Sequence, residues 1–155
     1  MRAAALVLAA VLLAACGGSR PSAASNLPPQ PPSPPIVEAP NPNFELVVVE
    51  AVPNADDEGV SYTAVFVDGA EAGKTAVGAR SQEKILRLRL PAGNQPVRLE
   101  HWLLPPVGEW TRLPDLRQPR ERFVRVEDGS LVRLTLRYPV SGPPTLLIAR
   151  EAAPK

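Results

Sequence analysis

The stretch VDGAEAGKTA, residues 67–76, carries the residue types of a phosphate-binding loop. Gly69 is followed after three residues by Gly73, Lys74 and Thr75, and a P-loop uses glycines, a lysine and a hydroxyl residue to hold nucleotide phosphates. That pattern has four residues between its glycines, and it opens a helix whose N-terminal amides contact the phosphates. Here the spacing is one residue short, and the residues after Thr75 lead toward a strand. We therefore expect a hairpin turn and no bound nucleotide.

His101 is the single histidine of the chain. It alternates with Val97, Leu99 and Leu103, which places it on an apolar strand face, where a histidine is more often a core residue than a catalyst. No G-x-S-x-G sequence supplies a serine nucleophile, and no second histidine could complete a metal site. We expect no catalytic residue, no metal and no cofactor. The alternative is a small hydrolase that uses His101 with the long loop of residues 105–119.

Two groups of acidic residues could also do chemistry. Asp56, Asp57 and Glu58 offer the hard oxygen ligands that calcium prefers, but they lack the spaced ligands of an EF-hand, so we expect a solvated turn. Glu109 and Asp115 flank the loop of residues 105–119 and could form a carboxylate pair, although nothing in the sequence determines their separation.

The N-terminus predicts where the protein resides. Residues 3–15 form an apolar run after Arg2, and the run is shorter than the roughly 20 residues of a membrane-spanning helix. Its end, Leu13-Ala14-Ala15-Cys16, resembles the lipobox of bacterial lipoproteins. The resemblance implies cleavage before Cys16, lipidation of its sulfur and acylation of the new N-terminus with chains such as palmitate. The alternative is an ordinary signal peptide, or an uncleaved anchor, in which Cys16 is incidental.

A lipidated Cys16 anchors the protein to a membrane without spanning it, since several acyl chains together bind a bilayer firmly. Cys16 is the only cysteine, so no disulfide is expected. In many Gram-negative lipoproteins an aspartate after the cysteine retains the protein at the inner membrane, and here that residue is Gly17. We therefore expect a cell-envelope protein at the outer membrane, on its periplasmic or surface side.

The composition divides the chain into four parts. Residues 1–15 are the signal peptide, and residues 16–42 hold the lipidated cysteine and a proline-rich linker that favours extended polyproline II. At about 3.1 Å per residue, the proline-rich residues 21–42 reach up to roughly 70 Å from the lipid. Residues 43–150 form one folded domain, and residues 151–155 form a tail.

The folded domain shows the period of two that is typical of strands with one buried face. Leu86, Leu88 and Leu90 alternate with Arg87 and Arg89, and the same alternation runs over residues 132–138. Other strands are expected at 44–52, 60–67, 97–104, 121–127 and 145–149, separated by Gly-, Asp- and Pro-containing turns. About seven short strands without a helical pattern predict an all-β fold, a single small antiparallel β-sandwich.

The turn motifs resemble a known family. VFVDG at 65–69, GKT at 73–75, LRLPAG at 88–93 and VRL at 97–99 are similar to the PEGA domain of bacterial envelope proteins. The resemblance covers roughly residues 58–137. It implies a small β-sandwich, related in shape to carboxypeptidase-regulatory domains, that acts as a binding or structural module.

Charge and aromatic residues indicate a partner-binding surface. From residue 74 onward there are fifteen bases and eight acids, and no nucleic acid is expected as a partner of an envelope protein. Alternation places four arginines away from the core, where neighbouring strands would make them a continuous basic face, and two tryptophans lie at the long loop: Arg87, Arg89, Arg133, Arg137, Trp102 and Trp110. The expected function is therefore a non-catalytic binding or structural module whose partner is an envelope protein or an anionic polysaccharide. Alternatives are the hydrolase and an accessory subunit of an export or surface-assembly complex.

Overall fold

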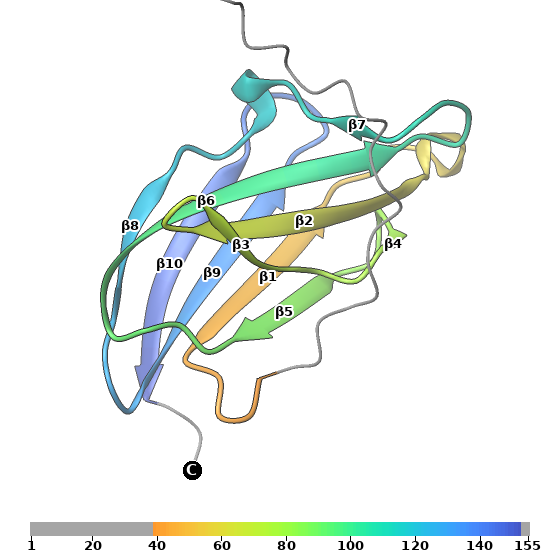
Figure 1. Cartoon of the computed structure of the whole chain (residues 1–155). Coiled ribbons are helices and arrows are strands. Elements are labelled where there is room, and N and C mark those ends of the chain that lie inside the picture. Colours follow the sequence, from red (N-terminus) through yellow and green to blue (C-terminus); the bar gives the residue numbers. More distant parts are fainter. Residues whose placement is uncertain (1–38, 153–155) are drawn as a thin grey trace, which may run out of the picture.

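The computed structural model describes residues 39–152, which form two packed β-sheets (Figure 1). The predicted all-β sandwich is confirmed. Its strands are β1 (Phe44–Glu50), β2 (Val60–Val67), β3 (Ala70–Lys74), β4 (Gly78–Ala79), β5 (Lys84–Leu88), β6 (Gly93–Leu104), β7 (Thr111–Arg112), β8 (Arg122–Val126), β9 (Ser130–Tyr138) and β10 (Thr145–Ala152). The helical content of residues 39–152 is limited to two three-residue 3₁₀ turns, η1 (Ala55–Asp57) and η2 (Asp115–Arg117). No helix in this described part has the length and apolarity needed to cross a bilayer.

The first sheet has four strands in the order β10-β9-β1-β5. β1 pairs antiparallel with β5 and parallel with β9, where Phe44 lies opposite Val132 and Glu50 lies opposite Tyr138. This parallel pair is an exception to the antiparallel sandwich expected from the sequence. It is possible because the strands of the other sheet lie between β1 and β9 in the chain, which provides the long crossover that parallel neighbours require.

The second sheet has six strands, with β3-β2-β6-β7 in order, β4 on β2 and β8 on β6. β6 is twelve residues long, so β8 pairs with its beginning and β7 with its end. β3, β4 and β7 were not among the expected strands. β4 and β7 have two residues each, which is too short for any period to be visible.

The hairpin predicted at residues 67–76 is confirmed. Asp68 and Gly69 join β2 to β3 with positive φ angles of 50° and 79°. Two consecutive positive φ values are the signature of a type I′ turn, which favours Asp-Gly and has the twist that an antiparallel pair needs. The residues after Gly69 continue as a strand rather than as the helix of a P-loop.

The core lies between the two sheets and is built from the alternating apolar positions. Leu46, Val65 and Leu134, from three different strands, are fully buried. The buried hydrophobic cluster contains Phe44, Leu46, Val48, Val65, Leu86, Leu88, Leu90, Val97, Leu99, Val124, Val126, Val132, Leu134, Leu136 and Tyr138. The side chains that alternate with the core residues lie on the outer faces of the sandwich, where a binding partner could contact them.

Candidate functional site

A group of polar residues is buried between the sheets, at the end of the sandwich where β1 stops. We call Glu50, Ser61, Thr63, Lys84 and His101 the polar cluster. All five are buried, and they come from four strands. Sequence analysis did not single out Glu50, because a charged residue at the end of an apolar run usually marks the point where a strand reaches solvent.

Glu50 is the centre of the polar cluster. Its Oε1 accepts hydrogen bonds from the Ser61 hydroxyl and, at 3.2 Å, from Nζ of Lys84. Its Oε2 accepts a 3.1 Å hydrogen bond from Nε of Arg80. Lys84 also donates to the carbonyls of Ala79 and Gln82 at 2.9 and 3.2 Å, so its three donors are matched by three acceptors.

His101 contributes its whole imidazole to this cluster and is only 1% exposed. Nδ1 lies 2.8 Å from the Thr63 hydroxyl, and Nε2 lies 3.3 Å from Oε2 of Glu50. The second contact is poorly aligned for a hydrogen bond, so we treat it as electrostatic attraction. The ring also packs on Tyr138, with 4.3 Å between ring centroids. His101 therefore occupies the core position that alternation predicted.

Burial and pairing act in opposite directions on the charges of the cluster. Burial alone would raise the pKa of Glu50, but the contacts with His101, Ser61 and Lys84 outweigh it and lower the pKa from 4.5 to about 2. Burial lowers the pKa of Lys84, and attraction to Glu50 offsets this only in part. Glu50 is thus held as a carboxylate by its neighbours.

The order Thr63, His101, Glu50 resembles the nucleophile, base and acid of a hydrolase. Such a nucleophile must touch its substrate, whereas Thr63 has no exposed surface. The loop of residues 105–119 hydrogen-bonds to the main chain of His101 and not to its ring. The side-chain amide of Gln118 accepts from the His101 N–H and donates to the His101 C=O, and the Leu113 N–H donates to the same carbonyl. The geometry therefore gives the cluster a structural role, in which it joins the two sheets.

The acidic groups that sequence analysis considered are not brought together. Asp115 accepts a 2.8 Å hydrogen bond from Arg112, and Glu109 is exposed in the loop without an ion pair to any of residues 39–152. Asp56 and Asp57 lie in η1, where Asp57 accepts a 3.0 Å hydrogen bond from Asn54. Among residues 39–152 there is no group of three His, Cys, Asp or Glu side chains that could hold a metal ion.

The four candidate arginines lie on or beside the outer face of the four-stranded sheet. The continuous basic face depended on β5 and β9 being neighbours, but β1 lies between them and adds Glu45 to the row. Arg87 and Arg133 both donate to Glu45, at 2.7 and 2.6 Å. Arg89 donates to the Asn41 carbonyl at 3.0 Å. Arg137 is exposed and forms no ion pair with residues 39–152.

Glu45 explains why this face is not strongly basic. Burial alone would raise the pKa of Glu45, but the hydrogen bonds and charges of Arg133 and Arg87 outweigh it and bring the pKa below 4.5. Arg133 also pairs with Glu151 at 2.6 Å. Two carboxylates therefore balance the two arginines nearest the centre of the sheet.

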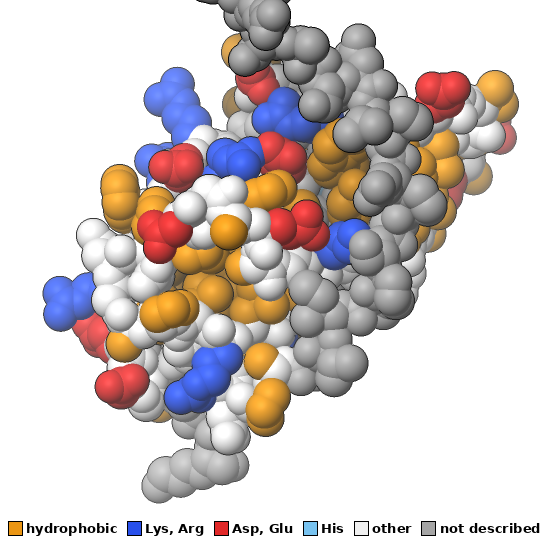
Figure 2. All heavy atoms as spheres, in the orientation of Figure 1, with side chains coloured by type: hydrophobic (Ala, Val, Ile, Leu, Met, Phe, Trp, Pro, Cys, Tyr) orange, Lys and Arg blue, Asp and Glu red, His pale blue; other side chains and the backbone are white. Residues whose placement is uncertain are grey.

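The two candidate tryptophans meet on the outer face of the six-stranded sheet. Tyr62 lies opposite Trp102 in the β2–β6 ladder, and their rings are parallel with centroids 6.2 Å apart. Trp110, which precedes β7, meets the ring of Tyr62 edge-on at 5.2 Å. We call Tyr62, Trp102 and Trp110 the aromatic cluster. Hydrophobic side chains gather over this part of the molecule, where β2, β6 and β7 meet (Figure 2).

Charged side chains surround the aromatic cluster. Nζ of Lys74 lies 5.8 Å from the centre of the Tyr62 ring, and the Arg98 guanidinium lies 4.1 Å from the centre of Phe66. Arg98 pairs with Glu100, which is also 3.6 Å from Arg112. Tyr62 was missed by sequence analysis, although its position two residues into a strand could have been matched with Trp102 if the β2–β6 register had been known.

The candidate binding residues thus lie on opposite outer faces of the sandwich. Trp102 and Trp110 belong to the six-stranded sheet, and Arg87 and Arg133 belong to the four-stranded sheet, so they do not form one contact surface. Cys16 and the Leu13-Ala14-Ala15 sequence lie outside the described residues.

Comparisons with protein-family models, with curated proteins and with solved structures give no match to this chain.

Proposed function

We propose that this chain is a lipoprotein of the bacterial cell envelope whose β-sandwich is a non-catalytic binding module. Lipidated Cys16 anchors it to the outer membrane, and the proline-rich segment of residues 16–42 separates the sandwich from the bilayer. The aromatic cluster is the contact surface. The turn motifs that resemble PEGA domains support the same class of module.

The aromatic cluster is the observation that carries this proposal. Buried polar residues of the sandwich are closed to solvent, whereas Trp102 and Trp110 lie on an outer face and are half-buried. Tryptophan and tyrosine are enriched in interfaces because they offer large, rigid contact area together with a polar group. Tyr62 is buried against the two half-buried tryptophans, so the three rings form a packed aromatic patch on an outer sheet face.

The charges around the cluster suit a partner with both apolar and polar groups. Lys74 lies over the Tyr62 ring, and Arg112, which pairs with Glu100, lies opposite Trp102 in the β6–β7 ladder, so charges of both signs are present. Flat rings accept the C–H face of a sugar as well as an apolar protein side chain. The partner we propose is therefore an envelope polysaccharide or an envelope protein, and protease treatment separates the two.

Capture from envelope extracts tests the proposal. The full chain is compared with Trp102→Leu/Trp110→Leu and with Phe123→Leu, a matched control because Phe123 is exposed on the same sheet face but belongs to β8. We expect the wild type and the control to recover the same partner and the double variant to recover roughly tenfold less, the effect of losing one good aromatic contact.

Two further measurements make the result interpretable. Thermal unfolding of each variant shows whether a loss of capture reflects a loss of folding. Protease treatment of the extract removes a protein partner and leaves a polysaccharide. Equal recovery by all three proteins would show that the aromatic cluster is not the contact surface.

A further inference from the structure

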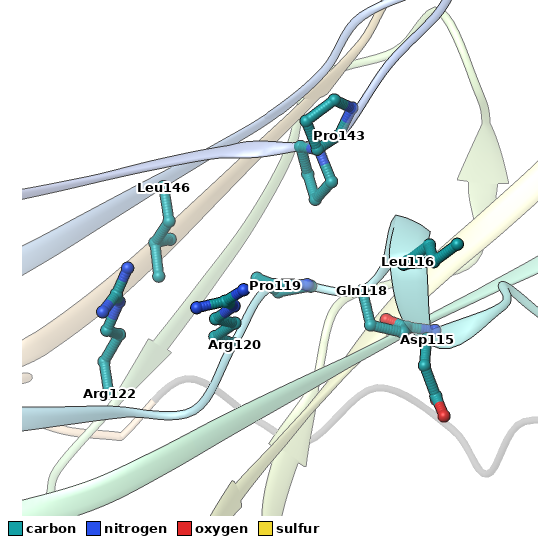
Figure 3. A pocket seen from close by; sticks show the side chains of 9 residues that line it. Asp115, Leu116, Gln118, Pro119, Arg120, Arg122, Pro143 and Leu146 are labelled. Carbon is teal, nitrogen blue, oxygen red and sulfur yellow. The ribbon is translucent and has the colours of Figure 1, made fainter.

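The sandwich has a hollow on the side where its edge strands β8 and β10 separate. A cavity of about 350 Å³ lies there, between the segment that leads from η2 into β8 and the turn from β9 to β10 (Figure 3). Its walls include Arg120, Arg122, Pro119, Pro143 and Leu146. We call this cavity the side groove, and its volume falls within the range of small-molecule sites.

Two arginines, Arg120 and Arg122, line the side groove. Arg122 lies opposite Val97 in the β6–β8 ladder, which places it on the core-facing side of β8, and it extends toward Leu146 (Figure 3). Arg120 lies beside Pro119 in the same cavity. Neither guanidinium forms a hydrogen bond or an ion pair with any of residues 39–152.

The other polar groups of the side groove are already occupied. The carboxylate of Asp115 accepts from Arg112 and points away from both arginines (Figure 3). The amide of Gln118 is used by the backbone of His101 and Leu113. Among residues 39–152, the polar groups that remain available for a ligand in the side groove are therefore the two guanidinium groups of Arg120 and Arg122.

An apolar surface continues from the groove along β10. The register of β10 with β9 places Leu146 opposite Leu136 and Ile148 opposite Leu134, so both side chains face the interior of the sandwich. Ile148 is nevertheless 44% exposed. β8 and β10 are edge strands that separate at the side groove, so the inner side of β10 is left partly uncovered there.

We infer that the side groove binds an anionic amphiphile, a small molecule with a carboxylate or phosphate head and an apolar chain. The head lies between Arg120 and Arg122, because a guanidinium pairs with either anion through two parallel hydrogen bonds. The chain lies along Leu146 and Ile148, where it removes apolar surface from water. This site is separate from the aromatic cluster, and the inference does not depend on the proposed function.

Calorimetric titration tests the inference with four probes: octyl phosphate, octanoate, octanol and inorganic phosphate. The full chain is titrated in buffer, and the same probes titrated into buffer alone provide the blank. We expect octyl phosphate or octanoate to bind roughly tenfold more tightly than octanol and than inorganic phosphate, since each of the latter lacks one half of the recognised structure. The tighter of the two amphiphiles identifies the head as a phosphate or a carboxylate.

Charge-matched variants locate the site. Arg120→Gln/Arg122→Gln should weaken binding of the amphiphile roughly tenfold. Arg89→Gln/Arg125→Gln removes the same charge outside the groove and should leave binding unchanged, since these side chains bond to Asn41 and Glu127. Equal affinities of the two variants would overturn the inference, as would equal binding of inorganic phosphate and octyl phosphate.

Tryptophan fluorescence separates the two sites. Both tryptophans of the chain belong to the aromatic cluster, and none lines the side groove. Amphiphile binding in the side groove should leave their emission unchanged. A shift in emission that followed the titration would place the ligand on the aromatic cluster and would also overturn the inference.

Discussion

Arg133 of β9 donates a 2.6 Å hydrogen bond from Nε to Oε1 of Glu45 on β1, and these two residues are 88 positions apart in the chain. Arg87 occupies the other carboxylate oxygen at 2.7 Å from the opposite side. Glu45 thus connects three strands across the outer face of the four-stranded sheet. It also neutralises the residues that would otherwise attract an anionic partner.

Replacing Glu45 by Gln should expose the charge of this face. The Glu45→Gln variant keeps the side-chain shape but removes the carboxylate that Arg87 and Arg133 share, so we expect later elution from a heparin column in a salt gradient. The free energy of unfolding should fall by about 1–2 kcal/mol, since the carboxylate is buried but both arginines are partly solvated. The control is Glu127→Gln, which removes the same charge beside the exposed Arg125. If both variants eluted together, Glu45 would not be masking the arginines.

Acid should remove the stabilisation that Glu50 provides. Its pKa is about 2 in the folded state against 4.5 as the ordinary value, so the folded state favours the carboxylate. The contribution is therefore fully present above pH 4.5 and is lost as the pH falls toward 2. The shift in the pKa of Glu50 corresponds to a contribution on the order of 3 kcal/mol to the free energy of unfolding.

The Glu50→Gln variant isolates this effect from the other carboxylates. Urea unfolding of both proteins between pH 7 and pH 3 should give a difference in the free energy of unfolding that is largest near neutrality and smaller in acid. A difference that stayed constant with pH would contradict a lowered pKa of Glu50.

Tyr138 should tolerate the loss of its hydroxyl. Its ring packs on His101, but the buried hydroxyl has no hydrogen-bond partner among residues 39–152. An unpartnered buried polar group costs roughly 1–3 kcal/mol, so Tyr138→Phe should leave the free energy of unfolding unchanged or raise it. Tyr138→Ala, which also removes the ring, should cost about 3–5 kcal/mol. Urea unfolding at pH 7 compares the three proteins, and a large loss in the Phe variant would reveal a contact of the hydroxyl.

Removing the thiol of Cys16 should release the protein from membranes. Cys16→Ser cannot accept the sulfur-linked lipid, and the acyl chains provide the anchor in our proposal. We expect metabolic labelling with palmitate to disappear and the protein to move from the membrane pellet to the supernatant after a high-salt wash. Cys16 is the only cysteine, so no second thiol can take its place. Continued sedimentation of the variant with membranes would mean that another segment holds it there.

Much of the fold could be predicted from the sequence because its signals are local. Alternation at residues 86–90 and 132–138 identified strands that face the core, and Asp68-Gly69 identified the hairpin. These patterns depend on residues that are neighbours in the chain, so one sequence is enough to read them.

The pairing of distant strands could not be predicted in the same way. β1 lies between β5 and β9, but nothing in the sequence of β1 indicates which strands pair with it. For this reason the row of arginines was expected to be continuous, and Glu45 was not recognised as its centre. The environment of Glu50 and the contact of Tyr62 with Trp102 depend on the same non-local pairings.

The parallel pairing of β1 with β9 has a consequence for synthesis of the chain. While the nascent protein is shorter than about 130 residues, β1 can pair with β5 alone, and the middle of the four-stranded sheet lacks a partner. Ribosomes add about 5–20 residues per second, so roughly 4 to 18 seconds separate completion of β1 from completion of β9. Contacts between distant strands also fold slowly, in milliseconds to seconds. The native four-stranded sheet can therefore form only after β9 has been synthesised, and until then the apolar residues of β1 are available to chaperones.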